Sequence, residues 1–164
     1  MTQPNALSIR RATIADIDLV HTFVIDLAEY ERLSHMVVAT RESLREALFG
    51  EHPGAEVLLA FEGEVPIGFA VYFHNFSTFL GVKGLWLEDI YVKPEYRRNG
   101  YGRQLLQHVA CIAHDRGCGR FEWSALDWNA PAVAFYRSLG AEQMDQWTTF
   151  RVTGAAIARL ANKG

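Results

Sequence analysis

The chain has 164 residues, of which 49% are hydrophobic and 21% charged, a length and composition that fit one globular domain and exclude a disordered or repetitive chain. Its formal net charge of −3 provides no basic field for a phosphate backbone, so we expect no nucleic-acid partner. The sequence has no signal-peptide pattern and no run of about 18 apolar residues, so we expect a cytoplasmic protein with no membrane partner.

The first part of the chain predicts one strand and two helices. Residues 7–11 have the pattern of a short strand. Residues 13–16 match a capping box, which opens a helix over residues 17–33 with apolar side chains at helical spacing. Thr40 is placed to cap a second helix, and Gly50 is placed to end it. Two helices therefore precede most of the predicted strands.

The rest of the chain alternates strands with helices. Residues 56–61 and 65–73 are close enough in sequence to predict an antiparallel hairpin. The other expected elements are strands at residues 85–92, 120–126 and 146–152, a helix around residues 105–113, and a short helix between Pro131 and Gly140. This order predicts an α/β fold with a mixed sheet. We expect a single domain over residues 7–164 and an N-terminal tail over residues 1–6.

Neither the cysteines nor the histidines predict a metal site. Cys111 and Cys118 are separated by six residues, a spacing that fits neither a zinc knuckle nor a redox C-x-x-C pair. His108, Cys111 and His114 recur every three residues on a predicted helix, so they spread over about a third of its circumference instead of converging. We expect reduced, packing cysteines and no metal cofactor.

A turn rich in arginine and glycine follows the strand at residues 85–92. Amides at a helix start lack partners within the helix and favour an anion such as a pyrophosphate, which glycine lets the backbone approach closely. The dinucleotide fingerprint needs glycine where Leu105 stands, and the P-loop needs a Gly-Lys-Ser/Thr ending, so we expect neither NAD nor ATP. The turn consists of Arg97, Arg98, Asn99, Gly100, Tyr101, Gly102 and Arg103.

Four motifs, together with this turn, carry a resemblance to a known family. They are Leu-Ala-Glu-Tyr-Glu at residues 27–31, Phe-Gly-Glu-His-Pro at residues 49–53, Leu-Glu-Asp-Ile-Tyr-Val at residues 87–92, and Trp-Asn-Ala-Pro-Ala-Val-Ala-Phe-Tyr at residues 128–136. Together they resemble the GNAT acetyltransferase superfamily, and most closely its spermidine/spermine N-acetyltransferase branch. The similarity extends over most of the chain.

The resemblance implies the GNAT fold, in which a mixed twisted sheet is flanked by helices and its fourth and fifth strands splay apart. Those strands are residues 85–92 and 120–126 here. Acetyl-CoA would bind as co-substrate, with its pantetheine in the gap and its pyrophosphate on the turn. The residues that the resemblance assigns to this binding are Ile90, Tyr91, Val92, Arg97, Arg98, Asn99, Gly100, Tyr101, Gly102, Arg103, Asn129 and Tyr136.

Acetyl transfer to an amine requires a base, an oxyanion donor and an acid. An alkylammonium with a pKa near 10.4 is almost fully protonated at neutral pH, so a base must remove its proton. By resemblance, Glu88 is this base, acting through a water, and Asp89 attracts the ammonium group. Neighbouring side chains of a strand face opposite sides, so both serve one site only if a bulge re-aims one. Tyr136 would protonate the leaving thiolate, and the N–H near Ile90 would polarise the thioester.

The expected acceptor is a primary amine of a small cationic molecule. Tyr30, Glu31 and the Glu88–Asp89 pair are similar to the polyamine branch, but that branch also carries an acid before the fourth strand. No Asp or Glu occurs between Glu64 and Glu88 here, so a diamine or a thialysine-like amino acid is as good a candidate as a polyamine. Two alternatives remain open, namely a protein lysine or N-terminal acetyltransferase and a non-catalytic acyl-CoA-binding sensor. The resemblance also implies a homodimer.

Overall fold

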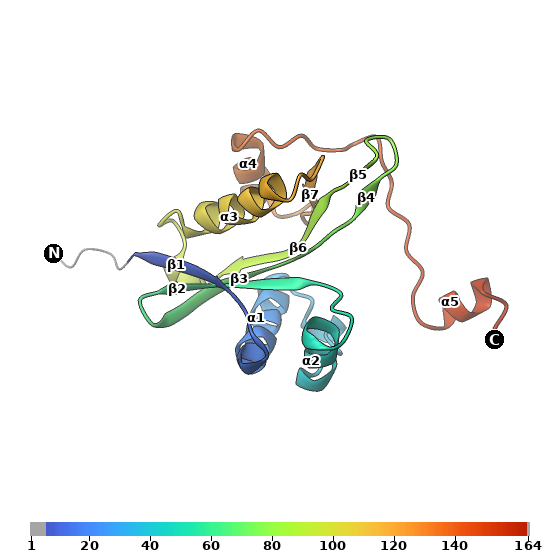
Figure 1. Ribbon diagram of the computed structural model, residues 1–164, viewed down its shortest axis with the longest axis horizontal. Helices are drawn as coiled ribbons and strands as arrows, with labels where there is room; N and C mark the ends of the chain where they lie inside the picture. Colours follow the sequence, from blue (N-terminus) through green and yellow to red (C-terminus); the bar gives the residue numbers. More distant parts are fainter. Residues whose placement is uncertain (1–5, 164) are drawn as a thin grey trace. The chain divides into compact units, whose positions relative to one another are not determined.

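A five-stranded sheet organises the first of two compact units in the computed structural model, which describes residues 6–163 (Figure 1). The first unit ends at Ser124 and the second begins at Ala125. The sheet has the order β1-β2-β3-β6-β7. Its strands are β1 (Leu7–Arg11), β2 (Glu56–Glu62), β3 (Val65–Phe73), β6 (Leu85–Val92) and β7 (Phe121–Trp123).

The sheet is mixed, as the sequence predicts. Neighbouring strands run antiparallel except β6 and β7, which run parallel. The turn between β2 and β3 is short and contains Gly63 at φ 62°, a left-handed conformation that glycine adopts without strain. A parallel neighbour requires a crossover connection, and the long helix α3 (Tyr101–Asp115) between β6 and β7 supplies it.

Helices cover both faces of this sheet. Helices α1 (Ile17–Tyr30) and α2 (Arg41–Phe49) lie on one side and α3 lies on the other (Figure 1). The core on the α1 side is built by Phe23, whose ring stacks on Phe69 with centroids 5.4 Å apart, and by Tyr91 of β6. Burying an aromatic side chain of this size contributes about 2–3 kcal/mol. The packing of α1 therefore fixes the face of β6 from which Tyr91 projects.

Local sequence signals set most element ends. The amide of Ser43 donates to the Thr40 hydroxyl at 3.1 Å, so Thr40 caps α2 as predicted. Helix α1 ends at Tyr30 and not near residue 33, because Arg32 takes a left-handed φ of 62°. A two-stranded hairpin of β4 (Phe76–Ser77) and β5 (Val82–Lys83), which the sequence pattern did not predict, precedes β6. Short 3-10 turns are present at Ile14–Asp16, Ser34–Met36 and Pro94–Tyr96.

The second unit contains helices α4 (Ala130–Ser138) and α5 (Ala155–Leu160) among its described residues. The predicted strand at residues 146–152 is wrong, because this segment has no regular secondary structure. An alternating apolar pattern forms a strand only when another strand takes up its backbone groups. Here the segment has no such partner, and Trp147 and Phe150 are exposed. The predicted strand at residues 120–126 is also shorter, because its pairing ends at Trp123.

Residues 1–5 of the expected tail lie outside the described residues, and the single domain over residues 7–164 stays a prediction. Between residues 6 and 163, no helix is both long and apolar enough to span a bilayer. The fold class of the sequence prediction, an α/β arrangement with a mixed sheet flanked by helices, is confirmed.

Candidate active site

A β-bulge in β6 brings two acidic side chains to one side of the sheet. In the register with β3, Asp89 lies opposite Val71 and Leu87 lies opposite Tyr72, which leaves Glu88 as the extra residue. Val71 packs against the α1 core, and cross-strand partners share a face, so Asp89 projects toward the α1 side. A regular strand would have placed Asp89 on the same face as Leu87. The bulge that the sequence analysis required is therefore present at Glu88.

Asp89 lies in an acidic cluster with Glu88 and Glu31. Burial, together with the negative charges of Glu88 and Glu31, raises the pKa of Asp89 to about 6. Burial also raises the pKa of Glu31, which is the residue directly after α1. Residues more than fifty positions apart in sequence are thus close enough to interact electrostatically. Such a cluster is costly without a cation, and an alkylammonium group would relieve the repulsion.

The pKa of Asp89 predicts a stability change with a defined pH window. The folded protein keeps this carboxyl protonated up to about pH 6, whereas its ordinary pKa is 3.8. The contribution of Asp89 to the free energy of unfolding is therefore fully present below about pH 4, and it is lost as the pH rises through 6. Asp89→Asn cannot ionise, so we expect it to raise the free energy of unfolding by on the order of 2 kcal/mol above pH 6 and to leave it unchanged near pH 3.5. Urea denaturation at the two pH values measures both, and an equal gain at each would contradict this explanation.

The outer edge of β6 is open beside this cluster. Only residues 85–87 of β6 pair with β7, so residues 88–92 present an edge that no strand of the described chain covers. The Lys93 amide donates to the carbonyl of Ile67 on β3 at 2.8 Å, so the backbone groups of Lys93 point away from the open edge. Because successive backbone groups point to alternate sides, those of Ile90 and Val92 point to the open edge. These are the two residues expected to pair with pantetheine, whereas the side chain of Tyr91 belongs to the core.

The turn after β6 has the conformation of an anion-binding site. Arg98 and Gly100 both take left-handed φ values, 68° and 79°, and Gly100 is the N-cap of α3. Amides that follow such a turn converge, and those at the helix start have no partner within the helix. The Tyr101 side chain is buried and its hydroxyl donates to the Glu62 carboxylate, so this residue anchors the helix start to the end of β2. Arg98 and Arg103 are exposed.

Arg97 has a role that sequence reasoning did not identify. Its Nε–H donates to the Val92 carbonyl at 2.8 Å, and its guanidinium lies 4.2 Å from the centre of the Tyr30 ring. Arg97 therefore connects the turn to both the end of β6 and the end of α1, where Tyr30 precedes Glu31. The contact joins residues far apart in sequence, and no local pattern signals it. The expected phosphate contact of Arg97 would have to use its Nη groups.

The last two predicted site residues belong to the second unit. The Asn129 side chain accepts a hydrogen bond from the Ala132 amide at 3.4 Å and caps α4. Tyr136 lies on the same helix, with its ring centroid 5.4 Å from that of Phe135. Asn129 thus has a structural task in addition to its expected cofactor contact. The assignments of Asn129 and Tyr136 to the site remain predictions.

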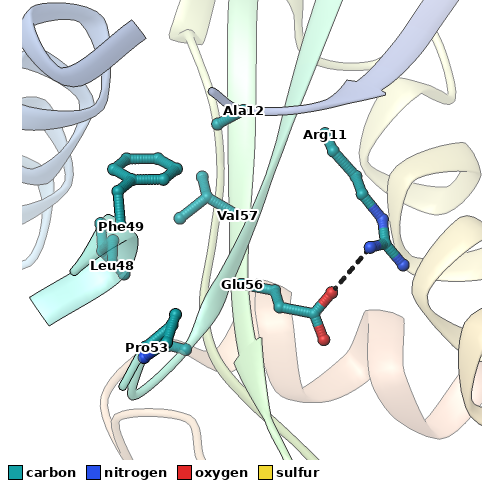
Figure 2. A pocket seen from close by; sticks show the side chains of 8 residues that line it. Arg11, Ala12, Leu48, Phe49, Pro53, Glu56 and Val57 are labelled. Atoms are coloured by element: carbon teal, nitrogen blue, oxygen red, sulfur yellow. Dashed lines mark ion pairs between the residues drawn. The ribbon is translucent and has the colours of Figure 1, made fainter. Parts of the chain in front are cut away.

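A separate pocket lies away from these residues. It has a volume of about 160 Å³ and lies between the end of α2 and strands β1 and β2 (Figure 2). Its walls include Phe49 and Val57 and the ion pair between Arg11 and Glu56, whose charged atoms are 3.3 Å apart. None of the predicted site residues lines it. Over residues 6–163, no group of three or more His, Cys, Asp or Glu side chains is arranged to hold a metal ion.

Comparisons with known proteins place the chain among acetyltransferases. The model of the Acetyltransferase (GNAT) family matches residues 23–141. The chain is 39% identical to thialysine N-epsilon-acetyltransferase of Sus scrofa, over 94% of this chain and 97% of that protein. It is 31% identical to L-ornithine N5-acetyltransferase of Arabidopsis thaliana, over 93% of this chain and 86% of that protein. An integron cassette protein from the mobile metagenome of V. cholerae has a similar structure, with a TM-score of 0.79 and 31% identity over 94% of this chain and 97% of that one.

The matched region includes the bulge at Glu88, the turn before α3 and the helix that carries Tyr136. It spans more than half of the chain, and the relatives resemble the chain over nearly its whole length. The chain therefore belongs to the GNAT family of acetyltransferases.

Proposed function

We propose that this acetyltransferase moves the acetyl group of acetyl-CoA to a primary amine of a small cationic molecule. The observation that carries the proposal is the gathering of Glu31, Glu88 and Asp89 beside the open edge of β6. A cluster of carboxylates attracts an ammonium group, and the open edge is suited to an amide-bearing chain such as pantetheine. The activities named for the thialysine and ornithine relatives, both directed at amino groups, support the same class of acceptor.

Members of the GNAT family use acetyl-CoA, and the residues after β6 fit its diphosphate. Gly100 has no side chain to obstruct the approach of an anion, and a Cβ atom there would have only the end of Gln104 near it, at 4.0 Å. Amides of the helix start and the exposed Arg98 and Arg103 would neutralise the phosphates. Backbone groups of Ile90 and Val92 would pair with the pantetheine amides, in addition to the bond that the Val92 carbonyl accepts from Arg97, and Asn129 would contribute a polar contact.

The chemistry follows from the expected roles of three groups. Glu88 accepts the ammonium proton through a water, because only about one alkylamine in a thousand is unprotonated at neutral pH. A backbone N–H near Ile90 stabilises the oxyanion that forms when the amine attacks the thioester carbonyl. The attacking nitrogen releases its second proton to water, and the tetrahedral intermediate collapses by breaking the carbon–sulfur bond. The Tyr136 hydroxyl donates a proton to the leaving thiolate and regains one from solvent. No covalent acetyl-enzyme is required.

A short acceptor fits the distribution of charge better than a long polyamine. The acidic side chains of this site are confined to the end of α1 and the bulge, and residues 65–87 contain no Asp or Glu. A long polycation would extend beyond this cluster without further carboxylates to pair with its charges. We therefore rank a thialysine-like or ornithine-like amino acid and a short diamine ahead of spermidine.

An amine panel incubated with acetyl-CoA tests the proposal against its two alternatives. Thiol release is measured with thialysine, ornithine, a short diamine, spermidine and a lysine-containing peptide. Turnover highest with the small amines supports the proposal. Preference for the peptide would instead identify a protein acetyltransferase, and binding of acetyl-CoA without turnover of any acceptor would identify a sensor.

We also propose a cytoplasmic homodimer that binds neither nucleic acid nor membrane. Large apolar side chains are exposed on both units, among them Phe79, which is 97% exposed, and Phe150, which is 91% exposed. Exposed apolar side chains form an interaction surface where they gather in one contiguous patch, and the net charge of −3 disfavours a polyanionic partner. Light scattering after gel filtration tests the dimer, and a monomer at micromolar concentration would contradict it.

A further inference from the structure

The indole of Trp86 lies next to the candidate base. Its Nε1–H donates to the Glu88 carboxylate, with 2.8 Å between Nε1 and Oε2. Glu88 itself is exposed, and as the extra residue of the bulge it has no residue opposite it on β3. An exposed glutamate samples several rotamers, and a fixed donor selects among them. The Trp86 N–H is such a donor.

Trp86 is paired on both sides and half-buried, whereas Glu88 is unpaired and exposed. It pairs with Phe73 of β3 on one side and with Glu122 of β7 on the other. Its neighbours Leu85 and Leu87 are buried on the opposite face. Residues 85–87 are the part of β6 that has strands on both sides, whereas Glu88 begins the part with an open edge. The hydrogen bond therefore links the candidate base to the segment of its own strand that is paired on both sides.

We propose that Trp86 is a positioning residue that holds the Glu88 carboxylate in the orientation required for proton removal. This inference rests on the proposed role of Glu88 as the base. The indole N–H occupies Oε2 and leaves Oε1 to accept the proton of the acceptor amine through water. Charge-assisted hydrogen bonds are stronger than neutral ones and more directional, so one such bond is sufficient to select a rotamer. Trp86 does not exchange a proton with the substrate.

A double-mutant cycle of Trp86→Phe and Glu88→Gln tests the inference. Phenylalanine keeps an aromatic ring but has no N–H. We expect Trp86→Phe to lower kcat by about tenfold, a typical consequence of losing one charge-assisted hydrogen bond to a reacting group, with the KM for acetyl-CoA unchanged. In the Glu88→Gln background we expect Trp86→Phe to lower kcat no further, because the base that it positions is already absent.

Three outcomes separate the inference from the proposed function. An equal loss of kcat in both backgrounds would mean that Trp86 has only a general structural role, and a wild-type kcat for Trp86→Phe would also overturn the inference. In either case an impaired Glu88→Gln enzyme would leave the proposed base intact. A Glu88→Gln enzyme with wild-type kcat at neutral pH would instead remove the base and the inference together.

Two further variants and an NMR spectrum distinguish the loss of this hydrogen bond from a general effect on folding. Trp86→benzothienylalanine replaces only the N–H by sulfur and keeps the shape of the indole, so it should reproduce the loss of kcat if the hydrogen bond is responsible. In an NMR spectrum of the N–H groups, the four tryptophans of the chain give indole N–H signals. The signal that disappears in Trp86→Phe is that of Trp86. Glu88→Ala should shift that signal, and an unmoved signal would show that the bond is not formed.

Discussion

Tyr136→Phe is expected to lower kcat by about 10-fold to 1,000-fold, because general acid assistance to a leaving group is typically of this order. The variant loses only the phenolic hydroxyl, so the thiolate would have to leave without a proton. The affinity for acetyl-CoA should not change, because the ring remains. Steady-state kinetics with a thiol reagent measures kcat, and calorimetry measures the affinity.

A matched control is available for this prediction. Tyr72→Phe also removes one phenolic hydroxyl. In the wild type this hydroxyl donates to the carboxylate of Glu56 on β2 at 3.2 Å. Tyr72 lies outside the predicted site, so its variant should keep the kcat of the wild type. A wild-type kcat for Tyr136→Phe would remove Tyr136 from the mechanism, and an equal loss in both variants would point to a general effect on folding.

Glu88→Gln is expected to lower kcat by about 100-fold at neutral pH and by progressively less as the pH rises toward 10. Without the base, the enzyme depends on the fraction of acceptor amine that is already unprotonated, and this fraction increases tenfold with each pH unit below the amine pKa. The measurement is a profile of kcat against pH with the best amine of the panel.

The control for this variant is Glu64→Gln, which neutralises an exposed glutamate in the turn between β2 and β3. Its pH profile should match that of the wild type. A Glu88→Gln profile parallel to that of the wild type would mean that Glu88 does not take the proton.

Local patterns in the sequence predicted the parts of the structure that depend on neighbouring residues. Short-range sterics and hydrogen bonding account for the hairpin of β2 and β3, the cap at Thr40 and the turn at Gly100. The bulge at Glu88 followed from the family resemblance, which assigns two adjacent acids to one site, and the register of β3 and β6 confirms the bulge.

Features that depend on distant residues were not predictable from one sequence. The contact between Arg97 and Tyr30 joins the turn to the end of α1 across the fold. The cluster of Glu31 with Asp89 arises from the packing of α1 on the sheet, although the resemblance had selected both residues. The segment at residues 146–152 has the alternation of a strand, but whether it becomes one depends on a partner that the sequence does not specify.

The measurement that tests the account most directly is calorimetric titration of coenzyme A into the wild type, Gly100→Ala and Gly81→Ala. Gly100, at φ 79°, lies in the turn proposed to bind the diphosphate, and Gly81, at φ 68°, has a similar backbone conformation in the β4–β5 hairpin. A Cβ atom strains both positions comparably. We predict that Gly100→Ala weakens binding by about tenfold or more and that Gly81→Ala leaves it unchanged. No measurable affinity in the wild type, or the same affinity in all three proteins, would contradict the placement of the coenzyme on this turn.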